Sequence, residues 1–406
     1  MKTIPGGICA AKGFSAAGMH AGIKPTSNPE RNDLALIYSE VPCTAAGVFT
    51  TNQVKAAPVL LDMEHLKNGR AQAIVANSYI ANACAPEGEQ TATRTAQKVG
   101  EVLSMDPEDV IVSSTGVIGV RLNVEAIEAA LPELAAKLNK DGSDAAARSI
   151  MTTDTVKKER SVEFTVGGKT AHVGGITKGS GMIHPHMGTM LCYLTTDVAI
   201  SQERLKQALT TTVGKTFNRI SVDGDMSTND TCVVLANGLA ENPVITEDGE
   251  DYDAFVAALE EVCTYLCRLM AKDGEGASHL ITCTVRGASS EEVAETCAKS
   301  VINSSLTKAA IFGADANWGR VLCAMGYAGV SFDPEKTDIS FASEQGSILV
   351  CKSGRGLDFD EDLAKKILLE EEVTIDIDMH EGDASVTCWG CDLTYDYVKI
   401  NGDYRT

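Results

Sequence analysis

Apolar and polar residues recur along the chain with two periods, which predict strands in some segments and helices in others. Strands punctuated by turns are expected over residues 34–60 and 109–120, where apolar and β-branched residues gather between turn residues. Helices are expected at 123–138 and 252–272, where apolar residues fall on one helical face. The acidic run 241–253 predicts a solvated loop. Strand-rich segments that alternate with helices indicate the α/β class.

Length and charge limit the kinds of molecule that this chain can be. At 406 residues it exceeds the size at which one hydrophobic core usually stops growing, so two lobes are expected. The net charge of −21 argues against nucleic acid and anionic membranes as partners. No apolar stretch approaches the roughly 20 residues of a membrane helix, and residues 1–7 lack the apolar run of a signal peptide. We therefore expect a cytoplasmic protein.

The thirteen cysteines are scattered and mostly lie in apolar surroundings, as small buried hydrophobic residues do in a reducing compartment. Cys388-Trp-Gly-Cys391 has the spacing of a zinc or redox pair. It has no second pair, and it lies in the strand-like segment 384–393, whereas a structural zinc site needs four ligands. We therefore expect no metal there.

The segment that carries the most chemistry is Lys178-Gly-Ser-Gly-Met-Ile-His-Pro-His-Met-Gly-Thr-Met-Leu191, in which Gly188 precedes Thr189. A threonine hydroxyl needs a base to act as a nucleophile, and a threonine at a chain terminus carries one in its own α-amino group. That amine has an unperturbed pKa of about 7.7–8.0. Cleavage before Thr189 would create nucleophile and base together. On local sequence alone, the start of a strand or helix is the plainer interpretation.

This segment resembles the self-processing site of the bifunctional ornithine acetyltransferase family, also called glutamate N-acetyltransferase. The family site reads Lys-Gly-Ser-Gly-Met-Ile-Ala-Pro-Asn-Met-Ala-Thr-Met-Leu and is followed closely by Thr-Asp, matched here by Thr196-Asp197. Similar matches run almost from end to end. They include Arg31-Asn-Asp-Leu-Ala-Leu-Ile, Ile311-Phe-Gly-Ala-Asp-Ala-Asn-Trp-Gly-Arg320 and Asp392-Leu-Thr-Tyr-Asp-Tyr-Val-Lys-Ile-Asn.

The resemblance implies a layered α/β fold of the ornithine acetyltransferase type, self-cleaved between Gly188 and Thr189. The pieces, an α chain of residues 1–188 and a β chain of residues 189–406, are expected to share one packed body and to pair as α2β2. The implied reaction moves an acetyl group from N-acetylornithine to glutamate through acetyl-Thr189, in ping-pong order and without metal or cofactor. Whether acetyl-CoA also serves as a donor is left open by the sequence.

The family pattern also implies roles for individual residues. Thr115 and Gly116 match the oxyanion hole, at the end of a strand where backbone N–H groups and a hydroxyl are exposed together; a turn after a strand is the plainer interpretation of these two residues alone. Lys178 can hold a carboxylate, and Glu275 can accept from an ammonium group. The positions that match family substrate contacts are Thr152, Lys178, Thr189, Glu275, Asn401 and Thr406.

Three places depart from the family pattern. The family's Asn-Ser-Gly-Asn-Ala-Asn-Ala-Cys-Thr-Gly is here Asn77-Ser-Tyr-Ile-Ala-Asn-Ala-Cys-Ala-Pro86, so that Tyr79 and Ile80 are expected to reshape a pocket wall. Ala-Pro-Asn becomes His184-Pro-His186, for which packing near the cleft is expected rather than metal binding, since no third ligand is evident. Gly188 replaces the commoner alanine.

Two other functions remain open at this point. A self-processed amidase or aminopeptidase would use the same nucleophile and pass the acyl group to water, and a non-catalytic binding protein would keep only the fold. The match of Lys178, Glu275 and the C-terminal Asn401 and Thr406 to the family pocket argues against the first function. The intact nucleophile and oxyanion pair argue against the second.

Overall fold

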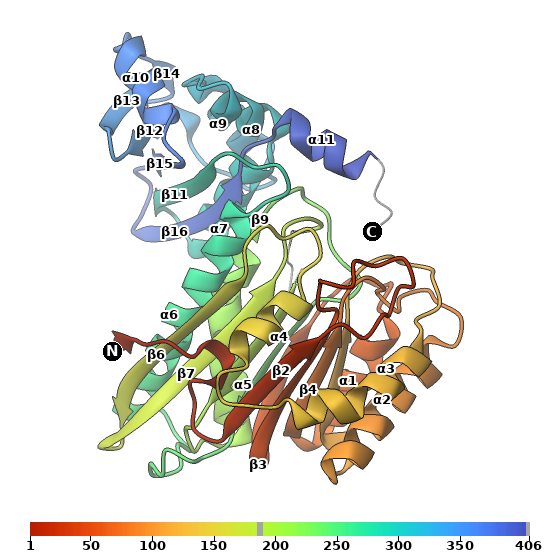
Figure 1. Ribbon diagram of the computed structural model, residues 1–406. Helices are drawn as coiled ribbons and strands as arrows, with labels where there is room; N and C mark the ends of the chain where they lie inside the picture. The colour runs from red at the N-terminus through yellow and green to blue at the C-terminus, as the bar shows by residue number, and fades with distance from the viewer. Residues whose placement is uncertain (185–189, 403–406) are drawn as a thin grey trace.

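Two mixed sheets, each covered by helices, form the body of the protein (Figure 1). The computed structural model describes residues 1–184 and 190–402. In that part of the chain one sheet has nine strands and the other has seven. Their cores are built from separate groups of buried apolar residues, so the molecule has two lobes.

The larger sheet has the order β1-β6-β7-β8-β10-β3-β4-β5, with β2 paired to β3. Its strands are β1 (Lys2–Thr3), β2 (Phe14–Met19), β3 (Leu34–Phe49), β4 (Arg70–Asn77), β5 (Val110–Ser114), β6 (Lys158–Val166), β7 (Lys169–Lys178), β8 (Leu191–Thr196) and β10 (Thr231–Ala236). Strand β8 lies between β7, with which it is antiparallel, and β10, with which it is parallel. The centre of this sheet therefore combines strands from before and after the Gly188–Thr189 junction.

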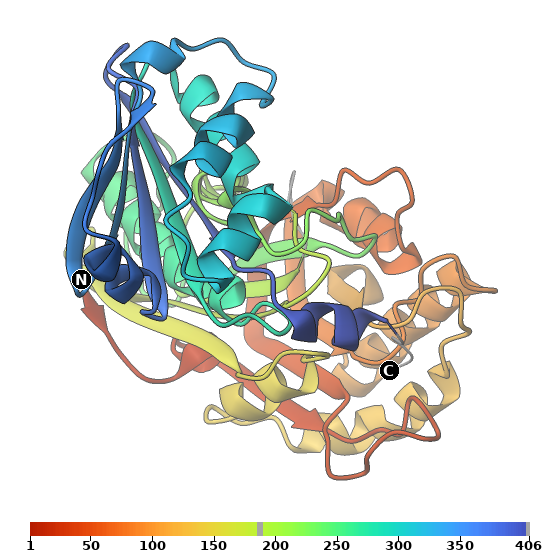
Figure 2. The same ribbon diagram turned by 90° about the horizontal axis from the view of Figure 1, so that it is seen from above.

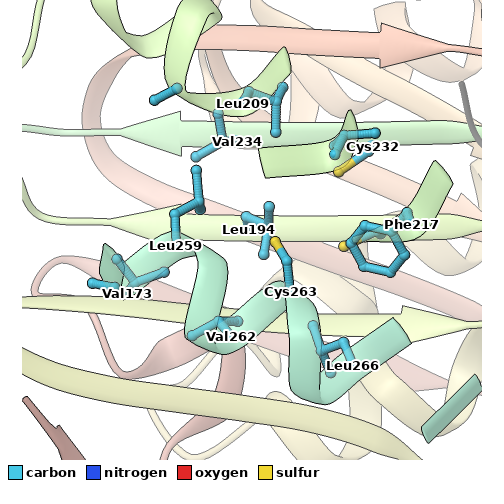
Figure 3. Close-up of a cluster of buried hydrophobic side chains, with 14 of the residues drawn as sticks. Val173, Leu194, Leu209, Phe217, Cys232, Val234, Leu259, Val262, Cys263 and Leu266 are labelled. Atoms are coloured by element: carbon cyan, nitrogen blue, oxygen red, sulfur yellow. The ribbon is translucent and has the colours of Figure 1, made fainter. Parts of the chain in front are cut away.

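Helices cover both faces of the larger sheet. One face packs against α5 (Gln202–Lys215) and α6 (Glu250–Lys272), where Leu194 and Val234 of the strands meet Leu209 and Leu259 of the helices (Figure 3). The other face packs against α4 (Ser143–Ser149). Three further helices pack around the strands at the β5 edge of the sheet: α1 (Ala57–His65), α2 (Gly88–Leu103) and α3 (Val124–Ala136).

The smaller sheet has the order β14-β13-β12-β15-β11-β16-β9. Its strands are β9 (Ile220–Ser221), β11 (Leu280–Ala288), β12 (Asp338–Ser343), β13 (Gly346–Lys352), β14 (Arg355–Gly356), β15 (Glu372–Asp378) and β16 (Ala384–Cys391). Its helices, which lie along one face (Figure 2), are α7 (Glu291–Asn303), α8 (Ser305–Phe312), α9 (Trp318–Gly326) and α10 (Glu361–Leu368). Helix α6 contacts β11 and β16 from the other face and joins the lobes.

The strongest helical patterns are confirmed. Helix α3 begins after Asn123, whose side chain caps it by accepting from Ala126 N–H, and it ends at Ala136 rather than at residue 138. Helix α6 begins at Glu250, inside the segment 241–253 that was expected to be a loop, so that the loop prediction is wrong for its last residues. Three acidic residues in the first turn of α6 favour this earlier start, because they complement the positive end of the helix.

Two strand predictions extend too far. Residues 57–60 belong to α1, where Pro58 at the start of the helix supplies a backbone angle that suits the first turn. The strand expected over 109–120 is β5 and ends at Ser114, so residues 115–120 are not strand. The chain turns there because Gly116 takes a φ of +133°, a conformation that favours glycine.

The cysteine pair at the chain's C-terminal end lies in a regular strand, β16. Cys388 belongs to the core under α7–α10, whereas Cys391 belongs to the core shared with α6. The two thiols therefore point to opposite faces of the sheet and cannot bind one ion together. Among the described residues, no helix combines the length and the apolar character needed to cross a bilayer.

Candidate active site

A cleft of about 790 Å³, its open mouth included, lies where the larger sheet, the loop after β5 and the C-terminal helix α11 (Tyr395–Asn401) meet. Six of the residues expected at the site line it. These are Thr115, Gly116, Thr152, Lys178, Glu275 and Asn401. Met190, the residue after Thr189, also lines it. Gly188, Thr189, His186 and Thr406 lie outside the described residues.

The loop after β5 is fixed by backbone hydrogen bonds. Thr115 N–H donates to the Asn77 carbonyl (2.9 Å), and Val117 N–H donates to the Tyr79 carbonyl (2.9 Å). Between them, Gly116 lies so close to the Tyr79 backbone that a Cβ at residue 116 would be 2.1 Å from the Tyr79 carbonyl carbon. Position 116 therefore accepts only glycine.

Two hydrogen-bond donors remain available on this loop. Within residues 1–184 and 190–402, neither the Thr115 hydroxyl nor the Gly116 N–H has a hydrogen-bond partner. The backbone N–H of Thr115 is already used by Asn77. The donors that the loop can offer to a group in the cleft are therefore the Thr115 side chain and the Gly116 backbone.

Lys178 ends β7, and its backbone pairs with Leu191 at the start of β8. This register holds the lysine beside the chain that follows Thr189. Its ammonium group donates to Thr152 Oγ1 (2.7 Å) and lies 4.0 Å from Asp154 Oδ2. Burial lowers the pKa of Lys178 below its ordinary value, and the Asp154 carboxylate opposes this shift.

A buried ionic network that the sequence did not predict lies behind Lys178. Asp154 accepts hydrogen bonds from the backbone N–H groups of Thr152 (3.0 Å) and Gly179 (2.7 Å). Lys158 Nζ lies 2.7 Å from Asp154 Oδ1 and also pairs with Asp273. Burial alone would raise the pKa of Asp154, but the ammonium groups of Lys178 and Lys158 lower it. The network ties the loop before β6 to the end of α6.

Glu275 follows the end of α6 and also lines the cleft. Its backbone N–H donates to the Ser180 carbonyl (2.8 Å), and one carboxylate oxygen accepts from Asn401 Nδ2 (2.7 Å). A Cβ at Gly181 would lie 2.4 Å from the Glu275 carboxyl carbon, so the glycine makes room for this carboxylate. Helix α11 thus returns the end of the chain to the cleft through Asn401.

Asp230 also lines the cleft, and the sequence did not predict it there. It precedes β10 and is almost fully buried. Its Oδ2 has no hydrogen-bond partner among the described residues. Burial raises the pKa of Asp230 well above its ordinary value, while Ser227 and Lys178 act against this shift. Nothing in its sequence context distinguishes it from the other acidic residues.

The departures from the family pattern have different surroundings. His184 Nδ1 lies 3.2 Å from Asn303 Nδ2 and 3.4 Å from Ser221 Oγ, which places this ring against α7 and against β9, the edge strand of the smaller sheet. Ile80 is buried and bridges to the loop after β5. Tyr79 forms part of the wall against which Gly116 packs. Ile80 and Tyr79 thus support the loop that carries Thr115.

The cleft thus pairs free hydrogen-bond donors with a buried lysine and a carboxylate, an arrangement typical of enzymes that act on small charged molecules. The model of the ArgJ family matches residues 15–406. The arginine biosynthesis bifunctional protein ArgJ of Caldanaerobacter subterraneus subsp. tengcongensis is 52% identical over 407 residues and is matched over 100% of both chains. This chain belongs to the ArgJ family. It is an N-acetyltransferase of arginine biosynthesis.

Two solved structures are also similar. An arginine biosynthesis bifunctional protein from Bacillus halodurans is 44% identical, with a TM-score of 0.49, over 51% of this chain and 96% of that one. An ornithine acetyltransferase from Mycobacterium tuberculosis, solved in complex with ornithine, is 38% identical, with a TM-score of 0.40, over 47% of this chain and 99% of that one.

Proposed function

We propose that the protein transfers an acetyl group from N-acetylornithine to glutamate through an ester on Thr189. Self-cleavage between Gly188 and Thr189 first frees the α-amino group of the threonine. That amine then takes the proton of the hydroxyl, and Oγ attacks the acetyl carbonyl. Ornithine leaves with its α-amino group restored, and the α-amino group of glutamate later attacks the acetyl ester.

The observation that carries the proposal is that one cleft is lined by both a cation and an anion, Lys178 and Glu275. N-acetylornithine has an α-carboxylate and a side-chain ammonium group. Lys178 provides a cation for the first, and Glu275, held by Asn401, provides an anion for the second. Thr152 Oγ1 accepts a hydrogen bond from the Lys178 ammonium group, and its hydroxyl can donate to or accept from the same end of the substrate. Thr406, at the chain end, is proposed as a further contact.

The negative oxygen that forms during acetyl transfer needs hydrogen-bond donors. We assign this role to the Thr115 hydroxyl and the Gly116 N–H, because both face the cleft without a partner in the described part of the chain. One such donor contributes roughly 2.7–4 kcal/mol to transition-state stabilisation in other enzymes. The proposed chemistry needs neither a metal nor a cofactor.

The two pieces formed by cleavage are proposed to stay together. Strands β7 and β3 come from residues 1–188, whereas β8 and β10, which lie between them, come from residues 189–406. Separation would break two strand interfaces and expose the core beneath α5 and α6. Pairing of two such units as α2β2 is part of the proposal. So is a cytoplasmic location, where the thirteen free thiols stay reduced.

The test is an acetyl-transfer assay with N-acetylornithine as donor and glutamate as acceptor. Release of ornithine that depends on glutamate, with parallel lines in double-reciprocal plots, is expected of a ping-pong transferase. Release of acetate at a rate independent of glutamate would identify an amidase instead. Replacement of N-acetylornithine by acetyl-CoA in the same assay determines whether the thioester is a second donor.

A further inference from the structure

Tyr79 has an uncommon backbone conformation directly behind Gly116, which lines the cleft. Its φ is +73°, in the left-handed region, where the Cβ of an L-residue crowds the neighbouring carbonyl oxygen. A glycine, which the family pattern has at this position, adopts this conformation without that crowding. A tyrosine here therefore costs stability relative to glycine.

The Tyr79 ring contacts the guanidinium group of Arg31. The guanidinium carbon lies 5.5 Å from the ring centroid, within the range of a cation–π interaction. From its other side, Arg31 Nη2 donates to the carbonyl oxygens of Met151 (2.8 Å) and Thr152 (2.5 Å). The arginine is thus held between an aromatic face and the loop that carries a proposed substrate contact.

This contact reaches the charged end of the cleft. Thr152 Oγ1 accepts from Lys178, so that the Tyr79 ring, Arg31, Thr152 and Lys178 form a continuous series of contacts. The backbone of the same tyrosine accepts from Val117 N–H in the loop after β5. Tyr79 therefore connects the two sides of the site, one through its ring and the other through its carbonyl.

We propose that Tyr79 is a positioning residue, whose ring holds Arg31 against the Thr152 carbonyl and so keeps Thr152 and Lys178 in place for the substrate carboxylate. This inference rests on the proposed function, in which Thr152 and Lys178 contact the substrate. The ring acts through its aromatic face, so the phenol hydroxyl is not needed. Tyr79 acts on substrate affinity, whereas the Thr115 hydroxyl acts on the chemical step.

Three substitutions of Tyr79 separate the effect of its ring on binding from the effect of its backbone conformation on stability. Tyr79→Phe keeps both the ring and the Cβ and should leave affinity unchanged. Tyr79→Leu keeps the Cβ in its unfavourable conformation but removes the ring, and should weaken substrate binding about two- to fivefold, the loss expected for an exposed cation–π contact. Tyr79→Gly also removes the ring but relieves the backbone. It should weaken binding to the same degree while its thermal unfolding midpoint equals or exceeds that of the wild type.

The test measures the Kd of ornithine by titration calorimetry and the unfolding midpoint for the wild type and each variant. Weaker binding in both the leucine and the glycine variants, with an undiminished midpoint in the glycine variant, supports the positioning role. If Tyr79 were needed only for stability, its replacement would lower the ornithine affinity and the unfolding midpoint together. In an Arg31→Met background, Tyr79→Leu should have no further effect on Kd.

The failures of the two proposals can be told apart. If the wild type binds no ornithine, the proposed function is wrong whatever Tyr79 does. If the wild type binds ornithine and the leucine and glycine variants bind it with the same Kd, the positioning role is overturned while the proposed function stands. An additive effect of the two substitutions in the double variant would also overturn it.

Discussion

Lys158 Nζ lies 2.7 Å from Asp154 Oδ1, and neither side chain has solvent-exposed surface. Because Lys158 also pairs with Asp273, its ammonium group is the only one that links the loop carrying Thr152 to the end of α6, among the ion pairs of the described residues. Charges buried in this way are stable only together, since removal of one partner leaves the others unpaired away from water. The loop that carries Thr152 is thus joined to the end of α6 through the buried Lys158 ammonium group.

Lys158→Met is expected to lower the free energy of unfolding by about 3–5 kcal/mol, because the buried Asp273 loses its cation and Asp154 keeps only the more distant Lys178. Lys157→Met is the matched control, since the neighbouring lysine forms its ion pairs with Asp144 and Glu159 partly exposed to solvent. It should cost no more than about 1 kcal/mol. Urea unfolding of both variants measures the difference, and equal losses would contradict the structural role assigned to the network.

The pH dependence of the free energy of unfolding should reveal how much the Asp154 carboxylate contributes to stability. Its pKa in the folded protein lies below the ordinary value of 3.8, so the stability that it contributes is fully present above that value and is lost as the pH falls below it. The difference in unfolding free energy between the wild type and Asp154→Asn should therefore be largest near pH 7 and should shrink as the pH approaches 4 and below. A difference that grows on acidification would contradict the direction of the shift.

Thr115→Val should lower kcat by about two to three orders of magnitude with a smaller change in KM, because the hydroxyl is the only donor that Thr115 has left for an oxyanion. Thr115→Ser keeps the hydroxyl and should retain most of the activity. Steady-state kinetics of the two variants checks this. If the valine variant turns over at the wild-type rate, the hydroxyl has no part in the reaction.

Gly181→Ala should raise the KM for N-acetylornithine, because the new methyl group would displace the Glu275 carboxylate from the side of Asn401. Gly214→Ala in α5 is the control, since no atom outside the neighbouring backbone of its own helix lies within 4 Å of the Cβ position there. We expect a clear rise in KM for the first variant and none for the second. Equal KM values would mean that Glu275 does not bind the substrate.

The sequence predicts those parts of the fold that depend on residues close together in the chain. The period of apolar residues predicted α3 and most of α6, and the same reasoning failed at residues 57–60, where a proline starts a helix inside an apolar run. The family motifs singled out Thr115, Lys178 and the other expected site residues, and six of these residues line one cleft in the structure.

The ionic network could not be predicted in the same way. Lys158 and Asp273 are 115 residues apart, and nothing local in the sequence distinguishes either of them from a surface charge. Their pairing depends on where α6 ends against the start of β6, which is a property of the folded chain. The same holds for the contact between Tyr79 and Arg31, because the sequence showed the replacement of glycine but not the positive φ that gives it a cost.

The central claim, that Thr189 is freed by self-cleavage and carries the acetyl group, is tested most directly by intact mass spectrometry. The purified protein should give two chains of about 20 and about 23 kDa, by their share of 42.9 kDa, with Thr189 at the N-terminus of the larger. With N-acetylornithine and no glutamate, the larger chain should gain the mass of one acetyl group and lose it when glutamate is added. Thr189→Ala should remain one uncleaved, inactive chain. Cleavage of that variant at the same bond, or an active wild type that never gains the acetyl mass, would contradict the account.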